Sequence, residues 1–208
     1  MEEIQEDLAK IRSGLDFTKT QLMPAINEIE YINEQTEILF EDANENTRIL
    51  SKVLKKSDRK RELVTRNSIR SSCACVEGFA YVLKNALQLT LEHTPEGTYT
   101  PKQLNFLQSE YSNGSGAENY KDALKCFARK YNVDVSRMFG SEEFTNLKSV
   151  FSLRNRLMHP KSAADLHVTI DDAILLSTSI CWFIESQRNV FNQVFRDIEK
   201  QAGEVFSL

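Results

Sequence analysis

The chain has few of the residues that interrupt helices. Its 208 residues include only 7 glycines and 4 prolines, whereas leucine, glutamate, lysine and asparagine are abundant. Because glycine and proline are the residues that most often weaken or break a helix, their scarcity favours an all-α fold. The alternation of apolar and polar residues that is typical of strands is missing too, and LHVTI at 166–170 comes nearest to it.

Long apolar runs are also lacking. A membrane-spanning helix needs roughly 18 or more consecutive apolar residues, and no stretch of the sequence approaches that length. The first ten residues, MEEIQEDLAK, are acidic and have no apolar centre, unlike a secretory signal peptide. We therefore expect a cytoplasmic protein with no membrane partner.

The four cysteines do not form a metal-binding pattern. Cys73 and Cys75 are two positions apart on an expected helix and would point in different directions, while Cys126 and Cys181 are isolated. Neither a C-x-x-C motif nor a pair of histidines at ligand spacing is present. We expect buried, reduced thiols that act as small apolar residues, and we expect neither a metal nor a cofactor.

The net charge of −4 argues against a dedicated nucleic-acid-binding protein, but the charges are unevenly distributed. Residues 1–50 carry 4 Lys/Arg and 12 Asp/Glu, residues 51–72 carry 8 and 2, and residues 121–161 carry 9 and 4. The two basic zones could attract a polyanion locally. The alternative is that they are solvated helix faces, and charge alone favours this alternative.

Apolar residues recur at helical spacing along most of the chain. From Ile4 to Ile32 they form a stripe close to a heptad, which Pro24 interrupts. This pattern predicts a kinked long helix or two helices, followed by a helical run at about 35–56 and another at about 61–91. The strong acidity of the first stretch suggests that its outer face meets solvent or a basic partner.

The later helices are marked by capping residues. Thr100 before Pro101 predicts a helix start, Ser141 predicts another, and Thr169 or Asp171 opens a final long helix. The expected ranges are about 101–110, 118–131, 141–158 and 169–205. The last of these contains AILLSTSICWFI, which we expect to be buried on most faces.

The predicted architecture is therefore an all-α helical bundle. Composition divides it into an acidic N-terminal helical extension, residues 1–60, and a bundle domain, residues 61–208. The basic stretch at 55–61 is the best candidate for the boundary.

Most motifs of catalytic sites are absent. The sequence has no G-x-S-x-G, no glycine-rich phosphate loop and no H-E-x-x-H. Asp171 and Asp172 form a tight carboxylate pair, but they lie in a first helical turn, where acidic residues are favoured anyway. What remains is SLRNRLMHPK, 152–161, between an apolar helical run and a polar loop.

This stretch combines Arg154, Asn155 and His159. On a helix, Asn155 and His159 differ by only about 40° and share a face, whereas Arg154 and His159 differ by about 140°. Arginine binds phosphate in a bidentate manner and histidine changes charge near neutral pH, which suits acid–base cleavage of RNA without a metal. A single histidine supplies only one acid or base, and a two-fold dimer would supply the other. These residues alone still favour an ordinary polar helix end.

The segment LRNRLMHP resembles the signature of the HEPN superfamily (higher eukaryotes and prokaryotes nucleotide-binding domains). That signature is an arginine, then a polar residue that is often asparagine, then a few more residues and a histidine. Here four residues separate Arg154 from His159, and the first of them is Asn155. Pro160 and the following LHVTIDDAILLSTSI also look like the family, in which a loop leads into a long last helix. IRSSCACVEGFAYVLKNAL, 69–87, is similar to the small-residue helix of the family, with an acidic residue in its middle. The resemblance covers roughly 61–208.

The resemblance implies a helical bundle that dimerises and places both motifs in one cleft. It further implies a metal-independent endoribonuclease of a defence or toxin–antitoxin system. In such an enzyme His159 would transfer protons, Arg154 would hold the scissile phosphate, and Asn155 would orient the histidine or a phosphate oxygen. Arg156 and Lys161 would contact the RNA backbone. The implied partners are RNA, a second copy of the chain and an antitoxin or regulatory protein. Other members of the family are inactive interaction or scaffold modules, or nucleotide-binding partners of a nucleotidyltransferase.

Overall fold

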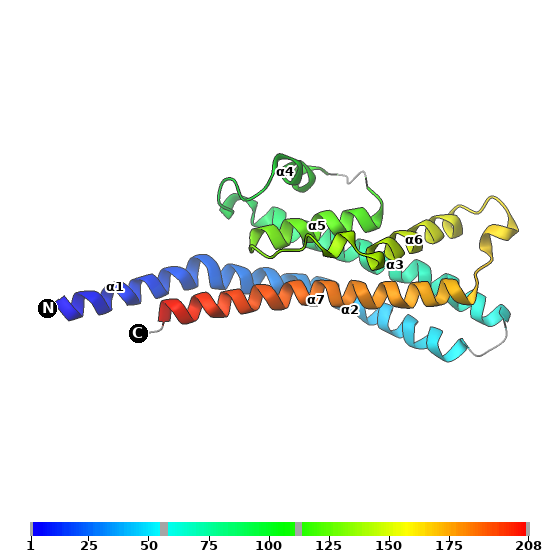
Figure 1. The fold of residues 1–208 in the computed structure, drawn as a ribbon, viewed down its shortest axis with the longest axis horizontal. Helices are drawn as coiled ribbons and strands as arrows, with labels where there is room; N and C mark the ends of the chain where they lie inside the picture. The colour runs from blue at the N-terminus through cyan, green and yellow to red at the C-terminus, as the bar shows by residue number, and fades with distance from the viewer. Residues whose placement is uncertain (1, 55–57, 111–113, 207–208) are drawn as a thin grey trace.

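The computed structural model describes residues 2–54, 58–110 and 114–206, and it confirms the all-α fold. Long helices run side by side, and the two ends of the chain extend together from one end of the bundle (Figure 1). The helices are α1 (Glu2–Phe17), α2 (Met23–Val53), α3 (Asp58–Leu89), α4 (Pro101–Gln108), α5 (Gly116–Lys130), α6 (Glu142–Met158) and α7 (Ile170–Phe206). No strand occurs in these three ranges, and within them no helix combines the length and hydropathy that crossing a membrane requires.

Residues 2–53 form one nearly continuous helix, which is the long-helix alternative of the two predicted from the sequence. A π-helical segment, Thr18–Leu22, joins α1 to α2 directly before Pro24. Proline has no N–H to donate to the preceding turn, and such helical irregularities accommodate the loss. In this segment the Met23 N–H donates to the carbonyl of Thr18, five residues back. The helical run predicted at 35–56 is therefore the continuation of the same helix.

The near-heptad stripe of this helix is only partly buried. Ile29 and Ile32 are in the core, whereas Ile11 and Leu15 are 54% and 55% exposed. The side chains of Ile4 and Leu8 lie outside the described part of the structure. The stripe therefore serves the core in α2, which packs on α3, and it reaches solvent in α1.

The predicted N-caps are confirmed. The Thr100 hydroxyl accepts a hydrogen bond from the Gln103 N–H, and the Gln103 side chain accepts one from the Thr100 N–H, which completes a capping box. The Ser141 hydroxyl caps α6 by accepting a hydrogen bond from the Phe144 N–H. Of the two alternatives at the start of α7, Thr169 is the cap: its hydroxyl accepts from the Asp172 N–H, and the Asp172 carboxylate accepts from the Thr169 N–H.

The aromatic core connects α2, α3 and α7. The Phe79 ring of α3 lies 5.9 Å from that of Phe40 in α2 and 5.6 Å from that of Phe183 in α7, measured between centroids. Gly78 allows α2 to approach α3, since a Cβ atom there would lie 2.6 Å from Leu39 Cδ1. One apolar core thus extends from the N-terminal helices into the bundle.

One expectation about α7 and the cysteines was wrong, because Cys181 is exposed. The apolar run of α7 is buried or half-buried at nine of its twelve positions, as predicted. Its exposed residues form one stripe at helical spacing, which the other helices leave uncovered: Ile174, Thr178 and Cys181. The remaining three cysteines are buried and free as predicted: Cys73, Cys75 and Cys126.

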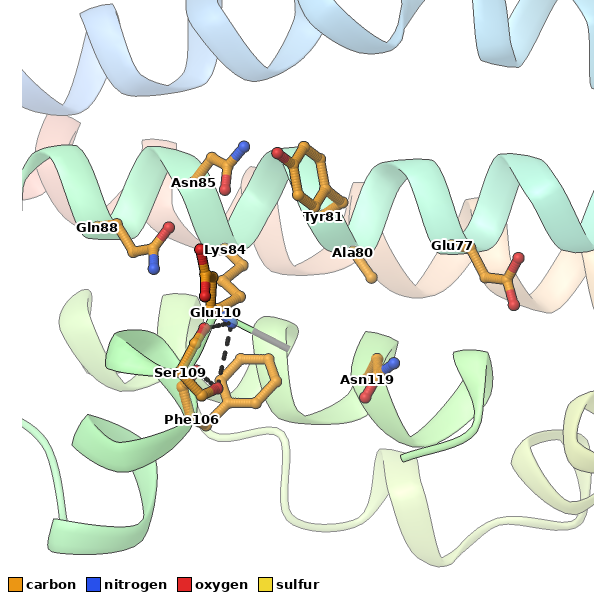
Figure 2. Close-up of a pocket in the computed structure, with 10 residues that line it drawn as sticks. All are labelled: Glu77, Ala80, Tyr81, Lys84, Asn85, Gln88, Phe106, Ser109, Glu110 and Asn119. Carbon is orange, nitrogen blue, oxygen red and sulfur yellow. Dashed lines mark hydrogen bonds between the residues drawn. The ribbon is translucent and has the colours of Figure 1, made fainter. Parts of the chain in front are cut away.

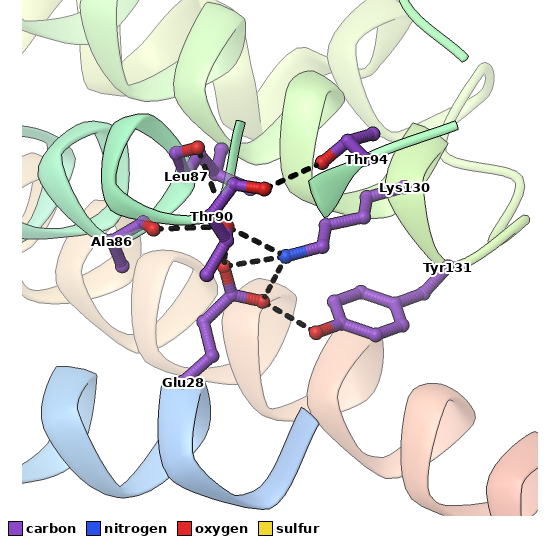
Figure 3. A network of polar contacts seen from close by, with 7 residues as sticks. All are labelled: Glu28, Ala86, Leu87, Thr90, Thr94, Lys130 and Tyr131. Atoms are coloured by element: carbon purple, nitrogen blue, oxygen red, sulfur yellow. Dashed lines mark hydrogen bonds and ion pairs between the residues drawn. The ribbon is translucent and has the colours of Figure 1, made fainter. Parts of the chain in front are cut away.

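A buried ionic network joins α2 to the ends of α3 and α5 (Figure 3). The two carboxylate oxygens of Glu28 lie 2.8 Å and 2.9 Å from Lys130 Nζ, and Glu28 also accepts hydrogen bonds from the hydroxyls of Thr90 and Tyr131. Part of the acidic N-terminal segment is therefore bound to the bundle through Lys130, a cation of α5. The division of the chain at residue 60 remains a prediction from composition, and residues 55–57 of the expected boundary lie outside the described residues.

Candidate functional site

The Arg154–His159 motif lies where α6 ends. His159 is the C-cap, with φ −127° and ψ 59°, and its N–H donates to the Asn155 carbonyl at 3.1 Å. Pro160 follows and cannot continue the helix. Asn155 and His159 are exposed, while Arg154 is partly buried. The structure thus places the three predicted residues at one surface, at the negative end of a helix.

Arg154 is oriented by an acidic residue from α3. Its Nη2 atom donates to Glu77 Oε2 at 3.0 Å, and its Nη1 atom donates to Asn155 Oδ1 at 3.1 Å. The side chains of Arg154 and Glu77 are 27% and 36% exposed, so that the ion pair is half-buried between α6 and α3. Two of the five guanidinium N–H groups are used in these contacts, and the arginine is held between α6 and α3, one turn before the C-cap residue His159.

A glycine makes room for this ion pair. At Gly116, the first residue of α5, a Cβ atom would lie 2.2 Å from Phe151 Cε1 and 2.7 Å from Glu77 Cγ. Any larger residue would push α5 away from the junction of α3 and α6. Gly116 was not predicted from the sequence, because the expected start of this helix lies two residues later. The side chains that Gly116 makes room for, those of Phe151 and Glu77, are also far from it in the sequence.

Arg156 binds the loop that follows the motif. Its Nη1 atom donates to the carbonyls of Asp165 and His167, at 2.9 Å and 3.0 Å. Lys161 is exposed, and its backbone N–H donates to Asp165 Oδ2 at 2.8 Å. The backbone N–H groups of Lys161 and Ser162 lower the pKa of the Asp165 carboxyl. The loop is thus held in a fixed turn, and of the two predicted RNA-contacting cations Lys161 is the more exposed.

Two arginines of α3 also bind this region, which was not predicted. Arg70 donates to the carbonyl of Leu157 at 3.2 Å, and Arg66 donates to the carbonyl of Leu166 at 3.0 Å. The last carbonyls of a helix lack partners within the helix, and Arg70 satisfies one of them at the end of α6. Part of the basic zone at 51–72 therefore stabilises the motif and its loop.

Two cavities share Phe106 in their walls, and one of them borders this site through Glu77. The α3–α4 cavity, about 240 Å³, is bounded by Glu77, Lys84 and Asn85 of α3, by Phe106 of α4 and by Glu110 (Figure 2). The α4–α5 cavity, about 310 Å³, also has Phe106 in its wall. Its charged residues are mostly cationic: Lys102, Lys121, Lys125 and Arg129, with Asp122. In the described ranges no cluster of three or more His, Cys, Asp or Glu residues could hold a metal ion.

Comparison of the chain with family models, curated proteins and solved structures gives no match. The case for a function therefore depends on the residues at the end of α6 and on the groups that surround them.

Proposed function

We propose that this protein is a metal-independent endoribonuclease of the HEPN type, whose active site is shared between two copies of the chain. The observation that carries the proposal is the arrangement at the end of α6. Arg154 is oriented by Glu77 and by Asn155, at 3.0 Å and 3.1 Å, and an exposed His159 ends the same helix five residues later. These are the groups that phosphodiester cleavage by acid–base catalysis requires.

The proposed reaction needs two proton transfers. His159 of one copy takes the proton of the ribose 2′-hydroxyl, and the 2′-oxygen attacks the adjacent phosphorus. Arg154 stabilises the negative charge on the pentacovalent phosphorus. The histidine of the second copy donates a proton to the departing 5′-oxygen, so that the products end in a 2′,3′-cyclic phosphate and a 5′-hydroxyl. Because each copy supplies one histidine, the site is complete only in the dimer.

Exposed apolar side chains near the motif support contact with a second copy. They lie at the end of the bundle where α3 begins, α6 ends and α7 begins (Figure 1): Leu63, Met158, Leu166, Ile170 and Ile174, which are 36–53% exposed. Exposed apolar side chains gathered at one end of a molecule favour protein–protein association. A two-fold axis near this end would bring two His159 side chains toward one another.

The direct test compares wild type with His159→Ala on a mixed RNA pool in the presence of EDTA. We expect the variant to lose about 10²-fold or more of the cleavage rate, as for removal of a general acid or base. His93→Ala is the matched control, because His93 is also exposed but lies in a short 3₁₀ turn after α3. Equal degradation by wild type and His159→Ala would refute the proposal.

Mixing the two proteins tests the shared site. If both copies contribute, adding excess His159→Ala to a fixed amount of wild type lowers activity, since mixed dimers lack one histidine. Activity that stays constant under this titration would contradict the shared site, provided that size-exclusion chromatography shows subunit exchange.

One observation favours a second candidate, an inactive interaction protein that binds an antitoxin or regulatory protein through its N-terminal helices. Ile11 and Leu15 are exposed on α1, although they belong to an apolar stripe. For this function, Ile11→Asn with Leu15→Asn should abolish capture of the partner, and Arg154→Ala should have no effect. The reverse result would reject this candidate.

A further inference from the structure

Lys84 is a buried cation in the wall of the α3–α4 cavity. It is 7% exposed, its Nζ atom donates to the carbonyl and the hydroxyl of Ser109, and it lies 5.1 Å from the centre of the Phe106 ring (Figure 2). These three partners carry no net charge. Burying an ammonium against neutral groups is costly, and the two hydrogen bonds to Ser109 occupy two of its three N–H groups. Lys84 is thus a donor fixed at the edge of a cavity.

Other walls of the cavity offer ring faces and acceptors. Phe106 lies on one side, and Tyr81, which is 66% exposed, lies on the α3 side. Asn85 adds an amide and Glu110 an exposed carboxylate. Sites for drug-sized ligands usually measure roughly 300–1,000 Å³, so that a cavity of about 240 Å³ suits a single planar ring system.

We propose that the α3–α4 cavity is a subsite for a guanine base of the RNA strand, and this inference rests on the proposed function. Guanine presents an acceptor, O6, next to two donors, N1–H and the N2 amino group. Lys84 can only donate and the Glu110 carboxylate can only accept, which matches this order of groups. Adenine presents the opposite order, a donor at N6 and an acceptor at N1. The ring faces of Phe106 and Tyr81 would stack on the base.

The position of the cavity agrees with this role. Glu77 contributes to its wall and binds Arg154 at 3.0 Å, so the cavity begins where the scissile phosphate is proposed to lie. Glu77 and Lys84 are seven residues apart on α3, about 10 Å along the helix axis. A nucleotide that flanks the scissile phosphate can reach across this distance. The carboxylates of Glu77 and Glu110 repel a phosphate, so that the uncharged base is the favoured occupant of the cavity.

The neighbouring α4–α5 cavity continues the path. It shares Phe106 with the α3–α4 cavity, and its wall holds four Lys/Arg side chains and the carboxylate of Asp122. One of the four, Lys121, is paired with Glu118, which leaves a cationic excess in Lys102, Lys125 and Arg129. Cationic side chains attract the phosphates of a strand without regard to its sequence. A strand would thus extend from Arg154, past the base subsite, to a cationic groove.

The test uses the full-length His159→Ala protein, so that binding is measured without cleavage. Labelled hexanucleotides of uridine with one central guanosine, inosine or adenosine are titrated by fluorescence anisotropy. We expect guanosine to bind about tenfold tighter than adenosine, as for one base recognised by two hydrogen bonds, with inosine between them because it lacks the N2 amino group. Adding Glu110→Gln should remove most of this preference, whereas the matched change Glu96→Gln, at an exposed loop acid, should keep it.

Several outcomes separate this inference from the proposed function. Equal binding of the guanosine and adenosine strands would overturn the subsite even if wild type cleaves RNA. So would a preference for guanosine that is as strong with Glu110→Gln as without it. Guanosine-selective binding by a protein whose wild type does not cleave RNA would support the subsite and reject the nuclease. Competition by free guanosine monophosphate as strong as that of the strand would overturn the assignment to RNA, since it would show a site for the free nucleotide.

Discussion

Replacing Glu28 by alanine tests how firmly the acidic N-terminal helices are bound to the bundle. The Glu28 side chain is only 1% exposed, and that of its partner Lys130 is 14% exposed. Its carboxylate accepts hydrogen bonds from Lys130 in α5 and from Thr90 and Tyr131, the residues that directly follow α3 and α5. Alanine at this position leaves a buried ammonium without its counter-charge and a buried phenol without its acceptor.

The structure sets the size of the effect. Removing one partner of a buried ion pair costs about 3–5 kcal/mol, because the remaining charge stays buried and unpaired. Lys130 keeps a hydrogen bond to Thr90 at 2.8 Å and some exposure, so we expect Glu28→Ala to lower the free energy of unfolding by about 3 kcal/mol. For a chain of this size, that corresponds to a Tm lower by about 6–12 °C.

Urea unfolding followed by far-ultraviolet circular dichroism measures this free energy. Glu30→Ala is the control, since Glu30 is an exposed acid on the same helix, and we expect a change within about 0.5 kcal/mol. The double variant Glu28→Ala/Lys130→Ala should cost less than the two single variants together, because no unpaired charge remains. A cost below about 1 kcal/mol for Glu28→Ala, or strict additivity in the double variant, would refute the reasoning.

Two further predictions concern the site and the cysteines. Gly116→Ala would place its Cβ 2.2 Å from Phe151 Cε1, so we expect thermal unfolding to show a free energy of unfolding lower by about 1–3 kcal/mol. Displacement of Glu77 should also lower the proposed ribonuclease activity. Gly140→Ala, with nothing within 4 Å of its Cβ, is the control and should match wild type. Burial raises the pKa of three thiols to about 12, so that they stay protonated until the pH approaches that value: Cys73, Cys75 and Cys126. Iodoacetamide at mildly alkaline pH should therefore modify Cys181 alone in the folded protein and all four cysteines after unfolding, and rapid modification of a second thiol in the folded protein, seen by mass spectrometry, would contradict this.

The sequence predicted the features that depend on local interactions. Helical periodicity follows from the backbone repeat, and an N-cap needs only a hydroxyl and an N–H three residues away. This explains why the starts at Thr100, Ser141 and Thr169 were found. The placement of His159 at a helix end followed equally from Pro160, the next residue.

Features that depend on contacts between distant residues were not predictable in the same way. Glu77 and Arg154 are 77 positions apart, and nothing in either local pattern says that the two helices meet there. Glu28 belongs to a stretch whose acidity predicted a face toward solvent or a basic partner, yet it is buried against Lys130, 102 positions away. The exposure of Cys181 likewise depends on which face of α7 the other helices cover.

The pair formed by Glu77 and Arg154 is also where the two candidate functions diverge. In a scaffold, an ion pair between α3 and α6 that is one quarter to one third exposed adds little stability, because solvent screens it. In a nuclease the same pair has a clear purpose, since Glu77 fixes the guanidinium, which after its contact with Asn155 still has three N–H groups for a phosphate. The glycine at position 116, whose Cβ would collide with Phe151 and Glu77, keeps this arrangement at the expense of helix propensity in the first turn of α5. The proposed nuclease function therefore gives a reason for an ion pair that adds little stability, whereas the scaffold function gives none.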